Sequence, residues 1–402
     1  MNKKKVLISV LVFLALAALV YLQVRTWRKF DWHRFWSVTE GVSISYILLG
    51  VALIYADYFL RAVRWKILLR PVRQTTAMEL VAPTMVGFTG LALLGRPGEF
   101  IRPYLIARKT RLTVSSQLAV WLVERIFDMG AFALIMAVNI LLSTRTLAKL
   151  PGFADGPPHS IGRYHLSSFE WFEISGFGLL AVVVVMACIA FLVRRNPSRV
   201  ARISERLIGG TSGQMIRTKV QAFGEGLNTV KDFKSFVQLS GISLLIWLVI
   251  GFAYLAVIHA YHNLAVTHHY RHFLEISFPG VLLLTAASVV GGVLQLPVVG
   301  GGSQLATIGV LHGIFNLSPE LSTSCGIMLW LVTFMSVIPA GLFLAHRERL
   351  SLIKLEKESE KIAAGPPDTH GTPGQVGARE ETPSNVAITK PDEPTKRDTW
   401  IN

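Results

Sequence analysis

A series of long apolar stretches constrains this chain more than any other feature. A membrane-spanning helix needs about 20 mainly apolar residues. Stretches near that length lie at 6–24, 42–60, 115–143, 172–193, 237–258 and 322–346. Only 16% of the residues are charged, whereas soluble domains carry about 25%. The sequence therefore predicts an all-α, polytopic integral membrane bundle with about six full spans.

Two further apolar stretches are broken by proline and glycine. Pro83, Gly87 and Gly90 interrupt 78–94, and Gly291-Gly292 interrupts 279–296, after which 303–316 forms a short helical piece. Irregular backbone at membrane depth needs burial in protein or a wet cavity. We interpret 78–114 and 279–316 as re-entrant or broken helical hairpins, as in transporters built from inverted repeats. Paired short spans, about 8–10 spans in all, and ordinary kinked helices are the alternatives.

The distribution of lysine and arginine predicts the orientation. Basic residues gather in 194–236, which places this segment in the cytoplasm. Both termini then lie in the cytoplasm, the first hairpin enters from that side, and the second enters from outside. The basic segment 25–41 falls on the outer side, against the rule.

The chain divides into three predicted parts. Residues 1–24 form an uncleaved signal anchor, for which a cleaved signal peptide is the alternative. Residues 25–350 form the polytopic domain, and the proline-rich segment 351–402 is a disordered cytoplasmic tail. The predicted location is the cell inner membrane.

Composition also bears on partners and cofactors. The net charge of +15 sits in short loops beside apolar runs, which favours anionic lipid over nucleic acid. Cys188 and Cys325 lie in apolar runs and are interpreted as packing residues. Five histidines between His259 and His272 lack interspersed carboxylates or cysteines, so we predict no metal site and no cofactor.

Three charged residues lie deep in the predicted span 115–143. Glu124 and Asp128 are four residues apart and share a helix face, and Arg125 lies about 100° away. Ionisable groups in a membrane are costly and seek partners, and we expect Arg96 and Arg102 to provide them. The group is either a buried ion-pair network that fixes helix register or a site whose guanidinium groups bind a lipid phosphate. In the second case the carboxylates hold the arginines or carry a proton.

A second charged face lies on the span that starts at 42. Asp57, Arg61 and Arg64 are spaced to share one face. Arg64 is expected to snorkel to the interface, with Trp65 as an interfacial anchor. Asp57 lies one turn deeper, and Asp57 and Arg61 join the candidate site.

The turn at 297–304 is the other candidate site. Gly300, Gly301 and Gly302 leave the backbone bare before a helix that is expected to begin with Ser303 and Gln304. Amides at a helix N-terminus attract phosphate or carboxylate. The alternative is a tight turn that needs positive φ.

Together these motifs resemble the lysylphosphatidylglycerol synthase transmembrane-region family, also called flippase-like or UPF0104. The resemblance covers most of residues 40–346. It rests on Gly95-Arg96-Pro97-Gly98-Glu99 with Arg102, Glu124-Arg125-x-x-Asp128, Arg61-x-x-Arg64-Trp65, the turn from Pro297 to Gln304, and Pro339-Ala340-Gly341. Two positions depart from the family pattern: Gln304 stands where glutamate is usual, and Trp330 lies near a frequent arginine.

The resemblance implies a bacterial or archaeal membrane protein that moves a phospholipid or glycolipid between leaflets. It also implies that Arg96, Glu99, Arg102, Glu124, Arg125 and Asp128 line the lipid path. An accessory subunit that presents a polyprenyl or glycolipid intermediate to a lipid-synthesis enzyme is the alternative function. A membrane-embedded transferase is a third. The aminoacyl transferase of the family's synthases is a separate soluble domain, so we expect no enzymatic activity here.

Overall fold

The computed structural model describes residues 30–154, 159–161, 164–166, single positions between 170 and 202, 233–262, 276–293 and 301–348. The predicted helix 6–24, most of the predicted helix 172–193, and the tail 351–402 lie outside the described residues.

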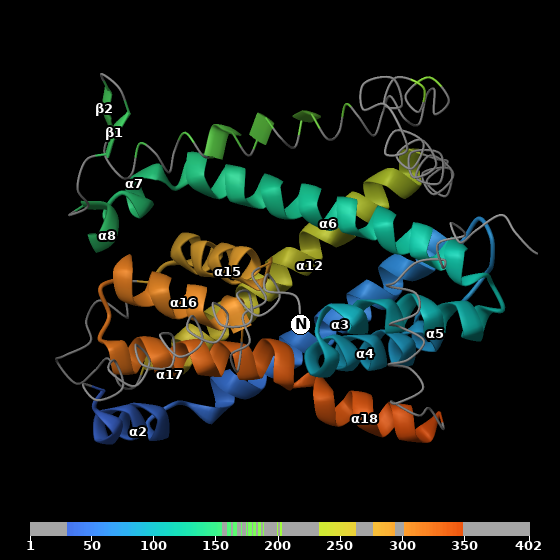
Figure 1. Ribbon diagram of the computed structural model, residues 1–402, viewed down its shortest axis with the longest axis horizontal. Coiled ribbons are helices and arrows are strands. Elements are labelled where there is room, and N and C mark those ends of the chain that lie inside the picture. Colours follow the sequence, from blue (N-terminus) through green and yellow to red (C-terminus); the bar gives the residue numbers. More distant parts are fainter. Residues whose placement is uncertain are drawn as a thin grey trace, which may run out of the picture. The chain divides into compact units, whose positions relative to one another are not determined.

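The described part is a helical bundle with one small strand pair (Figure 1). The early elements are α2 (Trp32–Glu40), α3 (Ile44–Leu69), α4 (Ala77–Leu94), η1 (Arg96–Phe100), α5 (Ile101–Thr110), α6 (Val114–Leu142), α7 (Thr144–Leu147), α8 (Pro151–Ala154), β1 (His159–Ile161) and β2 (Tyr164–Leu166). The later elements are α12 (Phe233–Ala260), α15 (Phe278–Val293), α16 (Gly301–Gly313), α17 (Pro319–Trp330), η2 (Leu331–Met335) and α18 (Val337–Arg347).

Five described segments are long and apolar enough to cross a membrane: α3, α4, α6, α12 and the continuous stretch Pro319–Arg347. The all-α polytopic prediction is therefore confirmed. The helix α3 extends to Leu69, beyond the predicted end at 60. Arg61, Arg64 and Lys66, which follow the predicted end of the apolar stretch, lie within this helix.

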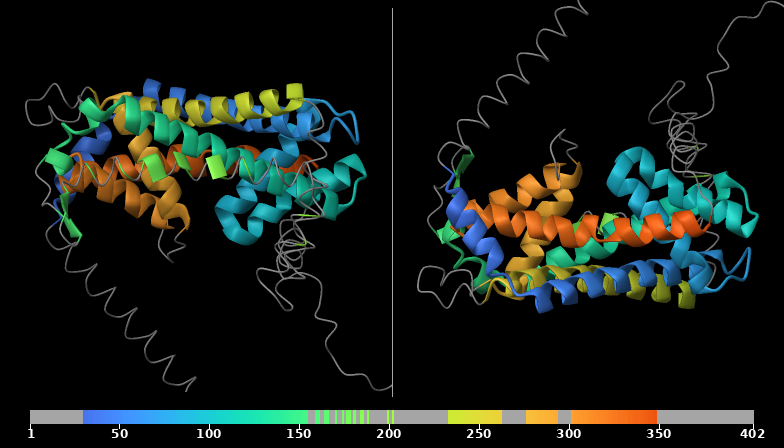
Figure 2. Two further views of the ribbon diagram at one scale, coloured as in Figure 1. Left: turned by 90° about the horizontal axis from the view of Figure 1, so that it is seen from above. Right: turned by 90° about the horizontal axis from the view of Figure 1, so that it is seen from below.

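The helices α3 and α12 pack along one another and lie together on one side of the bundle (Figure 2). Gly50 permits this approach, because a Cβ there would lie 3.4 Å from Val257 and 3.2 Å from Val332. The amide of Ser43 donates to the carbonyl of Ala260 at 2.8 Å and joins the ends of the two helices.

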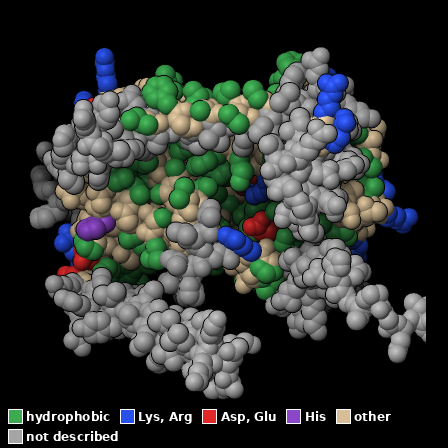
Figure 3. Space-filling view, turned by 45° about the horizontal axis from the view of Figure 1, so that its top comes forward, with side chains coloured by type: hydrophobic (Ala, Val, Ile, Leu, Met, Phe, Trp, Pro, Cys, Tyr) green, Lys and Arg blue, Asp and Glu red, His purple; other side chains and the backbone are tan. Residues whose placement is uncertain are grey.

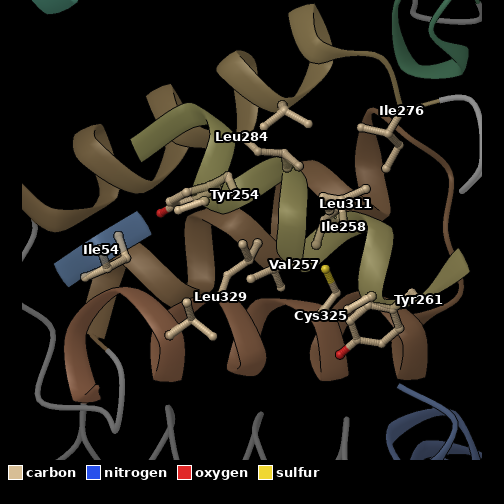
Figure 4. Close-up of a cluster of buried hydrophobic side chains, with 14 of the residues drawn as sticks. Ile54, Tyr254, Val257, Ile258, Tyr261, Ile276, Leu284, Leu311, Cys325 and Leu329 are labelled. Carbon is tan, nitrogen blue, oxygen red and sulfur yellow. The ribbon is translucent and has the colours of Figure 1, made fainter. Parts of the chain in front are cut away.

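A large apolar core surrounds α12 and joins it to α15, α16 and α17 (Figure 4). Val257, Leu284, Leu311 and Cys325 are all fully buried within it. The packing role predicted for Cys325 is confirmed, whereas Cys188 is exposed.

The segment 78–114 folds into a helical hairpin. Gly95 ends α4 with φ +70°, a conformation that favours glycine. The chain then turns through η1 and returns as α5. At 10 residues, α5 is about 15 Å long and cannot cross a hydrocarbon core of about 30 Å. The arms meet at two glycines, since a Cβ on Gly98 would lie 2.2 Å from the carbonyl oxygen of Gly90.

The helices α15 and α16 form a second hairpin, whose two arms also meet at a pair of glycines. A Cβ on Gly291 would lie 2.3 Å from the carbonyl oxygen of Gly302. The base of this hairpin contacts Ala260 and Tyr261, at the end of α12. The base of the first hairpin contacts Leu68 and Leu69, at the opposite end of α3. The two hairpins therefore enter the bundle from opposite ends (Figure 2), as predicted.

The last long segment is interrupted by a π-helical turn, η2. The amide of Ser336 donates to the carbonyl of Leu331 at 2.9 Å, five residues earlier. Pro339 follows, and its missing N–H leaves the carbonyl of Met335 without the usual helical donor. Trp330 directly precedes this turn. The helix α18 then packs on α4, where Gly341 lies against Thr89.

Part of the basic segment 25–41 forms the short amphipathic helix α2. The side chain of Asp31 caps it by accepting from the amide of Arg34 at 3.0 Å. Phe35 and Val38 are buried, and Thr39 bonds to Ser324 of α17 at 2.8 Å. The chain after α6 forms α7, α8 and the antiparallel pair β1–β2.

Candidate functional site

The charged residues of α3, α5 and α6 meet in one buried ion-pair network. Four arginines and three carboxylates take part, which leaves one positive charge in excess: Arg61, Arg64, Arg102 and Arg125 with Asp57, Glu124 and Asp128. Glu124 lies about 15 Å along α6 from its start, so the network is deep within a membrane-spanning helix. The charges predicted from the two spans are therefore brought together.

Arg64 is the centre of the network. Its side chain is fully buried, and its guanidinium group bonds to both Glu124 and Asp128. It also donates to Ser243 of α12 at 3.0 Å and to the second oxygen of Asp128 at 3.1 Å. The prediction that Arg64 snorkels is wrong, because α3 continues as a helix and directs this residue at the carboxylates of α6.

Trp65 is also buried rather than interfacial, so that prediction is wrong as well. Its indole N–H donates to Oε1 of Gln117 at 3.1 Å, which satisfies its polar atom inside the bundle. The guanidinium of Arg102 lies 4.5 Å from the centre of the indole ring. Trp65 thus supports the network through a cation–π contact.

Arg102 holds Glu124 with two parallel hydrogen bonds. Its Nη1 donates to Oε1 at 3.2 Å and its Nη2 donates to Oε2. Gly87 makes room for this arginine, because a Cβ there would lie 2.4 Å from Cβ of Arg102. The predicted pairing of Arg102 is confirmed.

Arg96, the other expected partner of the α6 carboxylates, is exposed at the start of η1. Arg64 takes the role that we predicted for Arg96. The sequence did indicate an inward position for Arg64, since it shares a helix face with Asp57. Its position near the predicted end of the helix nevertheless favoured the interpretation that it lies at the membrane interface.

Asp57 and Arg61 extend the network along α3. Nε of Arg61 donates to Oδ2 of Asp57 at 2.8 Å, and its Nη1 lies 3.7 Å from Oδ2 of Asp128. The guanidinium of Arg61 is 5.1 Å from the ring centre of Phe88. Oδ1 of Asp57 is buried without a hydrogen-bond partner among the described residues.

A pocket of about 50 Å³ connects the network to the surface. Its lining consists of Gly87, Phe88, Leu91, Glu99, Arg102, Trp121 and Arg125. Arg125 has a side chain that is 33% exposed, and its Nη2 lies 3.2 Å from Asp128 and 3.9 Å from Glu124. Figure 3 shows acidic and basic side chains beside a recess in a largely hydrophobic face. The pocket offers both charge and apolar surface.

The second predicted site is only partly described. Gly300 lies outside the described residues, and α16 begins at Gly301 rather than at Ser303. Gly301 has φ +61°, which supports the tight-turn interpretation. Gly302 packs on Gly291, and the hydroxyl of Ser303 lies 2.5 Å from that of Ser288. Gln304 is half-buried in the first turn.

The histidine-rich segment is also described only in part. His259 lies in the last turn of α12 and His262 follows that helix, whereas His268, His269 and His272 fall outside the described residues. Within the residues that the structure covers, no group of three or more potential metal ligands occurs.

Long apolar helices, two opposed hairpins and charge buried at membrane depth define a multi-pass membrane protein. The chain belongs to the family described as the lysylphosphatidylglycerol synthase TM region, whose model matches residues 6–341. Membership points to a membrane protein involved in lipid modification or translocation. No curated protein and no solved structure matches the chain.

Proposed function

We propose that this protein translocates a phospholipid or glycolipid between the leaflets of the cell inner membrane, with both termini in the cytoplasm. The observation that carries the proposal is the pocket that leads from the surface to the buried ion-pair network. A lipid headgroup would pass through the polar pocket while its acyl chains stay in the bilayer.

The network suits this task because it offers polar partners in a place where water is scarce. A headgroup that leaves water loses its hydration and needs replacement hydrogen bonds. Arginine can supply several donors in a fixed plane to a phosphate. The carboxylates of α6 form ion pairs with all four arginines, and Arg125 is the member of the network with the most exposed side chain.

The opposed hairpins support the same proposal. Discontinuous helices that enter from opposite faces are typical of substrate sites in transporters with inverted repeats. The sequence has no Walker A motif, so a gradient or mass action would supply the driving force. Glu99, Glu124 and Asp128 are the carboxylates at the site that could carry a proton.

Replacement of Arg125 by glutamine should slow lipid translocation about 10-fold or more, because a charge-assisted hydrogen bond to the phosphate is lost. The measurement is the rate at which dithionite bleaches fluorescent lipids in proteoliposomes that contain the purified protein. Arg108→Gln is the matched control, since Arg108 is exposed on α5, and it should keep the wild-type rate.

Two results would count against translocation. Equal rates for wild type, Arg125→Gln and protein-free liposomes would remove its support. Tight lipid binding without translocation would favour the second candidate, an accessory subunit that presents a lipid intermediate to a synthesis enzyme. The same pocket carries that candidate, since it requires headgroup binding alone.

A further inference from the structure

We infer that Asp57 is the residue at which a proton binds and through which a proton gradient drives translocation. Asp57 lies at the middle of α3, a helix that is long and apolar enough to cross a membrane. The other carboxylates of the site are Glu99, Glu124 and Asp128. Proton binding at Asp57 does not depend on the proposed function, whereas its link to transport rests on that function.

One carboxylate oxygen of Asp57 lacks a hydrogen bond. Oδ2 accepts from Nε of Arg61 at 2.8 Å, whereas Oδ1 is buried without a partner among the described residues. Asp57 is only 4% exposed, so water does not replace the missing donor. A buried charged oxygen without a donor bears the full cost of its lost hydration. A proton on Oδ1 relieves this cost, because it makes the carboxyl group neutral.

The two carboxylates of α6 are much better satisfied than Asp57. Both oxygens of Glu124 accept hydrogen bonds, which come from Arg64 and Arg102. Both oxygens of Asp128 accept from Arg64. Hydrogen bonds to the ionised form of a carboxyl group favour that form, so these two carboxylates resist protonation. The first proton that enters the network therefore binds to Asp57.

The surroundings of Asp57 contain few groups that could hold its charge. The nearby charged and titratable groups belong to α3, α6 and α12: Arg61, Arg64, Tyr58, Asp128 and Tyr254. The elements α4 and η2 also pack on α3. Glu79 is exposed in the first turn of α4, and η2 has no titratable side chain. Lys234 and His259 lie in the first and last turns of α12. Within the described part of the chain, Arg61 alone forms an ion pair with Asp57.

The effect of a proton on Asp57 reaches the pocket through Arg61 and Arg125. Nη1 of Arg61 lies 3.7 Å from Oδ2 of Asp128, and Nη2 of Arg125 lies 3.2 Å from the same oxygen. When Asp57 becomes neutral, Arg61 loses its closest charged partner and is attracted to Asp128, because charges interact strongly away from water. It then competes with Arg125, which lines the pocket. A proton on Asp57 thereby releases Arg125 toward the ligand.

The charge balance of the network links the proton to the lipid. The four arginines exceed the ionised carboxylates by one charge when Asp57 is ionised, and by two when it is neutral. Extra positive charge favours a negative group in the pocket, and by linkage that group favours the proton. Since proton and headgroup bind together, a proton gradient drives the lipid in the direction of proton flow.

The first test detects the proton in the purified, full-length protein. Infrared difference spectra recorded as the pH falls should show the C=O stretching band of a buried, protonated carboxylic acid. Isotope labelling of the aspartate carboxyl carbons should shift this band, and labelling of the glutamate carboxyl carbons should leave it in place. Asp57→Asn should remove the band. Glu79→Gln, which removes an exposed carboxylate from α4, should keep it.

The second test measures translocation under a pH gradient. Proteoliposomes with an acidic lumen carry fluorescent phosphatidylglycerol in the inner leaflet, and external dithionite reports its outward movement. We expect the wild-type rate to rise about 5-fold over the rate without a gradient, at the lower end of typical coupling between two sites. Asp57→Asn cannot bind or release the proton, so its rate should not respond to the gradient. Glu79→Gln should respond as wild type does.

The outcomes distinguish this inference from the proposed function. A wild-type protein without the band, a band that shifts on glutamate labelling, or a band that persists in Asp57→Asn overturns the inference even if lipid is translocated. Because the labelling uses wild type, it tests Glu99 and Glu124 even if Asp57→Asn does not fold. A wild-type rate that ignores the gradient overturns the role of Asp57 in transport. A band assigned to Asp57 without any translocation supports the proton site and rejects the transporter.

Discussion

Replacement of Arg64 by methionine is expected to lower the free energy of unfolding by about 3–5 kcal/mol, the usual effect of removing one partner from a buried ion pair. Arg64 is fully buried and bonds to both Glu124 and Asp128. Methionine fills part of the space but leaves two buried carboxylates with fewer positive partners. Unfolding of the purified protein by increasing concentrations of a denaturing detergent, followed by circular dichroism, measures the change in the free energy of unfolding.

A control and a rescue sharpen this result. Arg108→Met, at an exposed position of α5, should change the free energy of unfolding by no more than about 0.5 kcal/mol. Addition of Asp128→Asn to Arg64→Met should restore part of the stability, because Glu124 keeps its pair with Arg102 and the network returns to the wild-type excess of one positive charge. An Arg64→Met protein as stable as wild type would mean that Arg64 is not the centre of the network.

The rescued protein also separates the two interpretations of the network. Buried ion pairs contribute little net stability compared with well-packed neutral residues. If the network only fixes helix register, the double variant Arg64→Met, Asp128→Asn, once folded, should keep the lipid-binding and translocation properties of wild type. If the network positions Arg125 for a headgroup, the folded variant should lose them.

Gly98→Ala is expected to destabilise the protein by about 3 kcal/mol, at the upper end of the usual cost of overpacking. The new Cβ would lie 2.2 Å from the carbonyl oxygen of Gly90, so backbone must move against backbone. Because Glu99 is the next residue, the same shift should displace a side chain that lines the pocket. Thermal unfolding and lipid binding measure the two effects.

Gly130→Ala is the matched control for this substitution. Gly130 lies in α6, and a Cβ there would have no heavy atom within 4 Å. Alanine should therefore stabilise the helix by up to about 1 kcal/mol through its higher helix propensity. If Gly98→Ala and Gly130→Ala shift the melting temperature in the same direction, the close contact between the hairpin arms is not a constraint on folding.

Most of the fold could be predicted because bilayer physics acts on local sequence. The apolar stretches had to become helices, since backbone polar groups in lipid must bond within their own segment. Proline and glycine in 78–94 and 279–296 marked the two hairpins. The spacing of Glu124 and Asp128 placed both on one face of α6, and both are buried.

The errors arose where the polar group of a side chain could find a partner either at the membrane interface or inside the bundle. Arg64 and Trp65 lie near the end of an apolar run, where sequence patterns favour the interface. The carboxylates of α6 and the side chain of Gln117 offered partners inside the bundle, so both residues are buried. Nothing in the local sequence near residue 64 records that α6 packs there.

The class of molecule, its helices and hairpins, and the need for charged residues to face inward could all be read from local sequence, because a bilayer penalises exposed charge and unpaired backbone. Which arginine pairs with which carboxylate depends on how the helices pack. That packing leaves Arg125 and Glu99 on the pocket and the other arginines committed. Such partnerships depend on contacts between segments far apart in the chain, and helix periodicity carries no information about them.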